Sequence, residues 1–144
     1  MNLFYTMWII LFTSFPKINK SDITSKDFED FYKYLFQINQ TKKKSVSYEV
    51  VEVYLKELFA KQFPFVNDFL TFLKDEKKSI GLNKDQWESF YALLTFLGNK
   101  NKFLDSYNMS EAWPYLFDEF YLYFCKIKNI KPRIPEQVND YSEY

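Results

Sequence analysis

The side chains that carry acid–base, nucleophilic and metal chemistry are scarce in this chain of 144 residues. Histidine is absent, which excludes Ser-His-Asp and Cys-His catalysis and most zinc sites. Cys125 is the single cysteine, and with no base beside it we expect a buried, unreactive thiol in a reducing, intracellular compartment. Asp118 and Glu119 are adjacent and point about 100° apart on a helix, so they form no converging pair. These residues favour a protein that is not an enzyme and that needs no cofactor.

Residues 19–30 have the length and the polar start of an EF-hand calcium loop. Ile23 stands where a ligand is needed, Thr24 where the turn needs glycine, and Asp30 where a bidentate Glu is usual. We therefore expect no metal site here. The alternative interpretation of these residues is a helix–loop–helix that binds no calcium.

The charges balance, because Lys and Arg together number 19 and Asp and Glu together number 19. A neutral chain lacks the electrostatic attraction on which nucleic-acid binding depends. Arg133 is the single arginine, which leaves little for bidentate recognition of phosphate or guanine. We interpret the triplet 42–44 (KKK) as a solvated loop, with a phosphate or an acidic partner as the alternative. No nucleic-acid partner is expected.

Apolar residues recur at spacings of three and four through most of the chain, which is the helical period. Thr24, Ser47, Asn83 and Ser110 each stand where a helix N-cap is expected. No strand pattern is convincing. The fold expected is all-α, a compact single-domain bundle of about six helices that is EF-hand-like without calcium. The predicted helices cover residues 3–15, 26–38, 48–59, 64–74, 83–98 and 110–127.

Three segments differ in composition. Residues 1–25 are predicted to form a divergent N-terminal helix and loop, residues 26–128 the helical domain, and residues 129–144 a polar acidic tail that is loosely ordered beyond Ile134. The apolar run from Leu3 to Phe15 is shorter than the roughly 20 residues of a membrane span. It also lacks the basic start of a signal peptide. We interpret it as a buried helix, with a peripheral membrane anchor as the alternative.

Small acidic positions occur near the starts of two predicted helices. Asp85 lies in the first turn of its helix, where the helix dipole favours a carboxylate. Ala112 is predicted in the first turn of the last helix, and Asp118 about a turn and a half further on. If the two helices pack together, the three residues make a shallow acidic dent that suits a Lys or Arg of a partner.

The same residues lie in recognisable sequence motifs. Residues 83–87 (NKDQW) and 109–120 (MSEAWPYLFDEF) resemble the C-terminal half of the potentiating-neddylation (PONY) domain of the defective-in-cullin-neddylation family. The family pattern is K-D-x-W followed by A-W-P-x-L-x-D-[DE]-F. Residues 28–32 (FEDFY) are similar to the family's F-x-[DE]-F-Y helix, and the resemblance covers about residues 26–128.

This resemblance implies a scaffold and not an enzyme, one that promotes attachment of the ubiquitin-like modifier Nedd to cullins. It implies two partners, which are the cullin C-terminal winged-helix region and a conjugating enzyme with an acetylated N-terminal methionine. Asp85, Ala112 and Asp118 match the family's cullin-binding patch. Tyr54 matches a position of the acetyl-methionine pocket, and Ile38 falls where the family usually has Phe. The alternative is a generic helical interaction module with an unrelated partner.

Overall fold

Helices dominate the computed structural model, which describes residues 2–19, 21–97 and 100–135. The all-α class is confirmed, but these ranges contain seven α-helices and one π-helical turn where about six helices were predicted. The elements are α1 Leu3–Ser14, α2 Lys26–Asn39, β1 Ser45–Val46, α3 Tyr48–Leu55, the π-helical turn Lys56–Ala60, α4 Phe65–Asp75, β2 Leu82–Asn83, α5 Lys84–Leu97, α6 Lys100–Ser106 and α7 Tyr115–Ile127.

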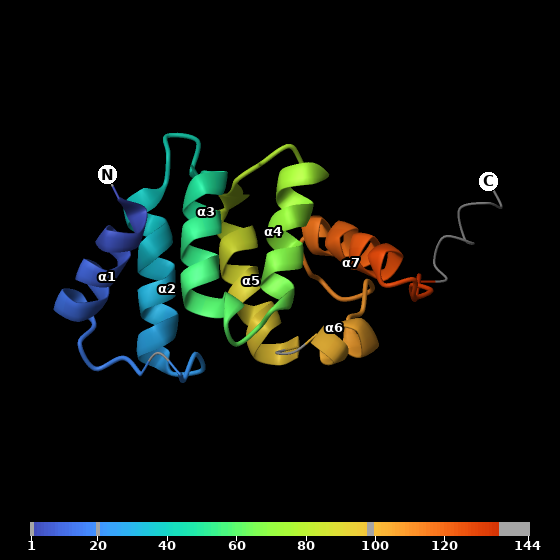
Figure 1. Ribbon diagram of the computed structural model, residues 1–144, viewed down its shortest axis with the longest axis horizontal. Helices are drawn as coiled ribbons and strands as arrows, with labels where there is room; N and C mark the ends of the chain where they lie inside the picture. Colours follow the sequence, from blue (N-terminus) through green and yellow to red (C-terminus); the bar gives the residue numbers. More distant parts are fainter. Residues whose placement is uncertain (1, 20, 98–99, 136–144) are drawn as a thin grey trace.

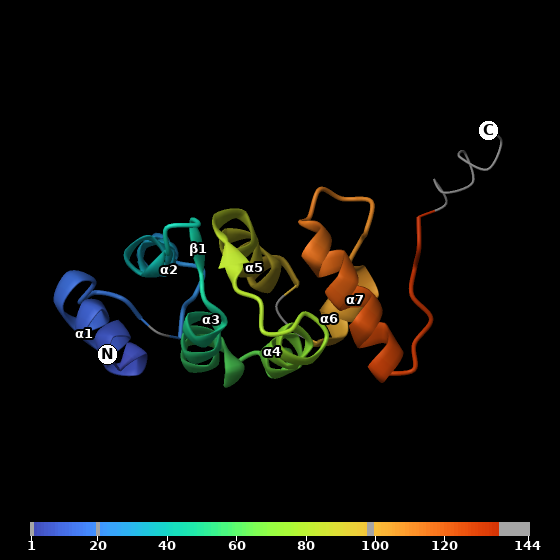
Figure 2. The ribbon, with the colours of Figure 1, turned by 90° about the horizontal axis from the view of Figure 1, so that it is seen from above.

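Two helix–loop–helix units, α2–α3 and α4–α5, are joined through their loops. β1 pairs antiparallel with β2, with Val46 opposite Leu82. The prediction of no strand is therefore wrong, because strands of two residues are too short to show an alternating pattern. Figure 2 shows β1 and β2 between the two helix pairs. This is an EF-hand-like arrangement, but it involves these loops and not the residues 19–30 that the sequence suggested.

The core is mainly aromatic, and one reciprocal pair joins α2 to α5. The Tyr32 hydroxyl donates to the Trp87 carbonyl oxygen at 2.7 Å, and the Trp87 indole N–H donates to the Tyr32 carbonyl oxygen at 3.0 Å. Their rings stack with centroids 4.4 Å apart and planes 4° apart. Both side chains are fully buried, so each polar group is satisfied without water.

Two of the four predicted N-caps are confirmed, and two are wrong. Ser47 accepts from the Val50 N–H, as predicted for α3. Asn83 and Gln86 form the reciprocal bonds of a capping box at α5, with distances of 2.8 and 2.9 Å. The two N-caps that were predicted wrongly are Thr24 at α2 and Ser110 at α7, and each has its own cause.

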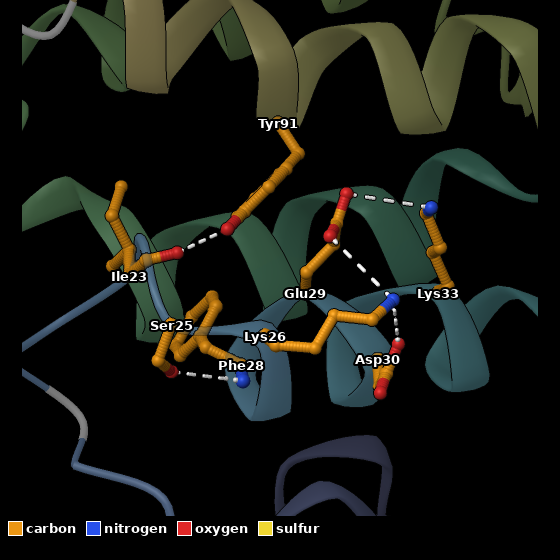
Figure 3. A network of polar contacts seen from close by, with 8 residues as sticks. All are labelled: Ile23, Ser25, Lys26, Phe28, Glu29, Asp30, Lys33 and Tyr91. Atoms are coloured by element: carbon orange, nitrogen blue, oxygen red, sulfur yellow. Dashed lines mark hydrogen bonds and ion pairs between the residues drawn. The ribbon is translucent and has the colours of Figure 1, made fainter.

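Figure 3 shows the start of α2, where Ser25 and not Thr24 is the cap. The Ser25 hydroxyl accepts from the Phe28 N–H at 3.1 Å. Thr24 instead donates from its N–H and its hydroxyl to Asp22 Oδ1. Two adjacent hydroxyl residues both fit the capping pattern, and the nearby carboxylate decides between them. In the same view the Tyr91 hydroxyl donates to the Ile23 carbonyl oxygen and ties this turn to α5.

The helix α1 lies at one end of the molecule (Figure 1) and packs against α3. Only Met7 and Leu11 are buried in it. Other large apolar side chains face outward, with Tyr5 65% and Phe12 64% exposed. The prediction of a helix is confirmed, but the prediction that this helix is buried is wrong for most of its side chains. A segment that is apolar on every side gives no sign of which face packs. None of the helices in the described ranges combines the length and apolarity that crossing a bilayer requires.

The C-terminal region departs most from prediction. α6 occupies a stretch rich in Asn and Lys that lies between the predicted helices 83–98 and 110–127. α7 begins at Tyr115 with Pro114 as its N-cap, and not at Ser110, because the residue before a proline is pushed out of helical geometry. Cys125 is buried, as expected. The predicted helix end at Gly98 and the tail from residue 136 lie outside the described residues.

Candidate functional site

The three residues of the predicted acidic patch all reach the surface. Asp85 is exposed in the first turn of α5 and Ala112 is exposed in the loop before α7. Asp118 is half-buried and lies in the first turn of α7, and not further along a helix that includes Ala112. Figure 2 shows the start of α7 beside α5. We use the name acidic patch for Asp85, Ala112 and Asp118 throughout.

The carboxylate of Asp118 is held by a buried tyrosine. The Tyr107 hydroxyl donates to Asp118 Oδ1 at 2.7 Å, and Tyr107 is only 1% exposed. Burial, followed by this hydrogen bond, raises the pKa of the Tyr107 phenol above its usual value of 10.0. The phenol therefore remains a donor at neutral pH. One carboxylate oxygen is fixed against the core, and the other can face a partner.

Tyr107 is itself immobilised on several sides. Its ring centroid lies 5.1 Å from that of Tyr121, 5.2 Å from that of Phe103 and 6.4 Å from that of Trp113. Its backbone carbonyl accepts a hydrogen bond from Arg133 Nη2 at 2.9 Å. The orientation of Asp118 thus depends on residues from α6, α7, the preceding loop and the segment after α7.

Sequence reasoning missed both Tyr107 and Arg133. Tyr107 was placed in a loop, and Arg133 was noted only as the single arginine. The signal that could have indicated Tyr107 is its position two residues before the motif of residues 109–120. Nothing local could have indicated Arg133, because its partner lies 26 residues away in the chain.

Asp85 lies on α5, which packs against the aromatic side chains of α7. Its Oδ1 accepts a long hydrogen bond of 3.5 Å from the Ser89 hydroxyl. Phe90, further along α5, has its ring centroid 6.3 Å from that of Phe117, the residue before Asp118. The two helices that carry the carboxylates are therefore coupled through adjacent core residues. Asp85 itself is solvated and less rigidly held than Asp118.

This arrangement suits recognition better than catalysis. In the described ranges, no three Asp, Glu or Cys side chains lie close enough together to hold a metal ion. Asp85 and Asp118 are surface carboxylates, and the small, exposed Ala112 side chain leaves room for a Lys or Arg stem over it. A cationic head can then approach the free oxygen of Asp118.

The two residues predicted to line a second pocket have different environments. Tyr54, in α3, is 0% exposed, and its hydroxyl accepts a hydrogen bond of 3.1 Å from the Asn39 side-chain amide. Ile38, in α2, is 41% exposed and not buried as its helical spacing suggested. Asn39 follows Ile38 directly, so the two predicted residues come from neighbouring parts of α2 and α3.

A pocket of about 690 Å³ opens between α1 and the π-helical turn. Trp8, Phe28 and Leu58 provide its apolar walls. Leu58 lies one turn beyond Tyr54, but neither Ile38 nor Tyr54 is among the residues lining this pocket. The π-helical turn that carries Leu58 is a local irregularity of a kind that often marks functional sites.

Comparison of the sequence with known proteins finds one matching family model and several related proteins. The model of a family described as "Cullin binding" matches residues 9–123. Human DCN1-like protein 5 is 31% identical over 107 residues, covering 74% of this chain and 43% of that protein. DCN1-like protein 3 of Xenopus tropicalis is 29% identical, covering 74% of this chain and 36% of that protein. Defective in cullin neddylation protein 1 of Candida glabrata is 28% identical, covering 68% and 40%. The chain thus spans less than half the length of these relatives.

Proposed function

The chain belongs to the cullin-binding family, and from this premise we propose that it is a non-catalytic scaffold that binds a cullin C-terminal region to promote neddylation. The observation that carries the proposal is the acidic patch, with Asp118 held at the surface by Tyr107. The names of two kinds of relative support it, since they are DCN1-like proteins and a defective-in-cullin-neddylation protein.

The proposed mechanism is proximity and not chemistry. A scaffold that holds the modifier-charged conjugating enzyme near the acceptor lysine of the cullin raises their effective concentration and restricts their geometry. In this mechanism the acidic patch orients the cullin through a basic side chain. No group of this chain needs to take part in bond formation.

The two carboxylates are expected to contribute unequally. Asp118 is half-buried and fixed, so an ion pair made there loses more water and is less screened by salt. Losing one half of a desolvated interfacial pair costs about 2–5 kcal/mol, whereas exposed pairs are worth only about 0.2–1 kcal/mol. Replacing Asp118 is therefore expected to weaken binding more than replacing Asp85.

The test is a titration of the purified chain against a cullin C-terminal fragment. Asp118→Lys and Ala112→Arg should each weaken binding at least about tenfold, which is about 1.4 kcal/mol. Asp27→Lys is the matched control, because Asp27, like Asp118, is a carboxylate in the first turn of a helix, but it is exposed and lies in α2. If both patch variants bind as tightly as the wild-type chain, the assignment is wrong.

We also propose that the chain binds the acetylated N-terminus of a conjugating enzyme in the region of Ile38 and Tyr54. The match of Tyr54 to a position of the family's pocket supports the proposal, and an apolar cavity is lined by Leu58, one turn beyond Tyr54, together with Trp8 and Phe28. An acetylated peptide from the conjugating enzyme should bind more tightly than its unacetylated form. Ile38→Asp should abolish that preference without altering cullin binding, and an unchanged preference would exclude this site.

A second candidate function is a helical interaction module with an unrelated partner. The exposed aromatic side chains of α1 favour it, because Tyr5 and Phe12 are each more than half exposed. Binding of that kind would be insensitive to Asp85 and Asp118 and would weaken little at high salt. The same titration, repeated in concentrated salt, separates the two functions.

A further inference from the structure

The segment after α7 turns back over the helix and contacts Tyr107, the residue that binds Asp118. The Ile130 N–H donates to the Cys125 carbonyl oxygen at 2.8 Å, which reverses the chain. The Arg133 N–H then donates to the Tyr121 hydroxyl at 3.0 Å. The Arg133 guanidinium lies 5.7 Å from the centre of the Tyr121 ring and donates from Nη2 to the Tyr107 carbonyl oxygen at 2.9 Å. These contacts hold the arginine in a fixed place.

A pocket of about 310 Å³ opens where this segment meets the loop after α6. We call it the Arg133 pocket. Its polar walls are Ser106, Asn108, Ser110 and Arg133. The two serine hydroxyls are exposed, and within the described part of the chain neither has a hydrogen-bond partner. The walls therefore present hydrogen-bond donors around a cation.

The charge of Arg133 is not neutralised within residues 2–19, 21–97 and 100–135, since it forms none of the ion pairs found there. A guanidinium has five N–H donors, and only one of them is bound to Tyr107. Asp105 and Glu111 flank the two serines in sequence but are not among the residues lining the pocket. The fixed fork of the guanidinium matches the geometry of a carboxylate.

Tyr107 joins this pocket to the acidic patch. Its phenol binds Asp118 and its carbonyl binds Arg133, so an anionic and a cationic group lie at the two ends of one residue. Asp118 and Arg133 are therefore linked through a single residue.

We propose that the Arg133 pocket is a second recognition site, which takes a carboxylate side chain of the same partner whose basic side chain binds the acidic patch. This inference rests on the proposed function. It makes the docking surface bipolar, with a negative pole at Asp118 and a positive pole at Arg133. Such a surface discriminates between partners by the order of their charges, because a reversed arrangement would place like charges together.

The test compares Arg133→Gln with Arg133→Glu in the titration against the cullin fragment. Both substitutions remove the guanidinium that donates to the Tyr107 carbonyl, so a purely structural role predicts similar weakening. A carboxylate site predicts that Arg133→Gln weakens binding by about three- to tenfold and that Arg133→Glu weakens it several-fold further. Lys131→Glu is the matched control, because Lys131 is exposed on the same segment and does not line the pocket.

Each outcome decides a different point. Equal effects of Arg133→Gln and Arg133→Glu, or a Lys131→Glu effect as large as that of Arg133→Glu, would overturn the carboxylate site. Asp118→Lys is measured in the same series. If it weakens binding while both Arg133 variants match the wild-type chain, the proposed function stands and this inference fails. If Asp118→Lys has no effect, the proposed function fails as well.

Discussion

The Tyr107 hydroxyl lies 2.7 Å from Asp118 Oδ1, and this bond ties a surface carboxylate to the aromatic core. The donor is almost completely buried, whereas the acceptor is half-buried. A carboxylate held in this way loses little conformational freedom when a partner binds, which is the benefit of preorganisation. The structure therefore gives Asp118 a rigidity that its position in the first turn of α7 would not provide alone.

Replacing Tyr107 with Phe should test this relationship without disturbing the ring contacts. The substitution removes the donor to Asp118 and is expected to lower the free energy of unfolding by about 1.5 kcal/mol, as for a hydrogen bond to a charged acceptor. Urea denaturation measures the loss. Tyr115→Phe is the matched control, because Tyr115 is 73% exposed, and it should change stability little. Equal stability of the wild-type chain and Tyr107→Phe would mean that the bond contributes nothing.

The fold should lose stability in alkali because buried phenols must ionise. Burial, followed by the hydrogen bond with Glu52, raises the pKa of Tyr48 from 10.0 to about 12. Because this pKa is higher in the folded chain, the neutral phenol stabilises the fold below pH 10, and that contribution is lost as the pH rises from 10 to about 12. Denaturation at a series of alkaline pH values should show the decline. Tyr48→Phe should flatten it, and an identical slope in that variant would refute the role of Tyr48.

The contact between the two loops leaves no room for a side chain at Gly81. A Cβ there would clash with the Val46 carbonyl oxygen and lie 2.9 Å from its carbonyl carbon. Gly81→Ala should therefore push β1 and β2 apart and cost about 1–3 kcal/mol, as other overpacked sites do. Thermal or urea denaturation measures the cost, with the exposed Ser79→Ala as the control. A stable Gly81→Ala variant would show that the loops adjust freely.

The Tyr32–Trp87 pair predicts where the greatest loss of stability should fall. Trp87→Ala removes a fully buried ring and the donor to the Tyr32 carbonyl, and should cost about 3–5 kcal/mol. Trp8→Ala, in the half-buried position on α1, should cost clearly less. Comparison of the two denaturation midpoints is the measurement. Equal losses would mean that Trp8 contributes as much as a fully buried side chain, contrary to its half-buried position.

Sequence patterns predicted helices best where one face is apolar and the other polar. Residues 26–39 and 65–75 are of this kind, and the predicted core positions Phe28, Phe31, Tyr32 and Leu35 are buried. The prediction failed where a pattern carries no such contrast. α1 is apolar all round, and α6 is short and polar. Strands of two residues exist only because their loops meet in the folded chain.

The candidate site was predictable only in part. Asp85, Ala112 and Asp118 come from motifs that can be recognised locally. The groups that support Asp118 are distant in sequence, since Tyr107 is 11 residues from Asp118 and 26 from Arg133. Such contacts depend on how α6, α7 and the last segment fold together. The start of α7 was predicted at the wrong residue. Ser110 fits the pattern of an N-cap, but Pro114 keeps the residue before it out of helical geometry, so the helix begins after Pro114.

The electrostatic role of Asp118 is tested most directly by the affinity of the chain for a cullin C-terminal fragment with and without the charge of Asp118. Asp118→Asn keeps the shape of the side chain and an oxygen that accepts from Tyr107, so only the charge is removed. If the charge binds the cullin, this variant binds at least about tenfold more weakly than the wild-type chain. Wild-type affinity in Asp118→Asn would contradict this role.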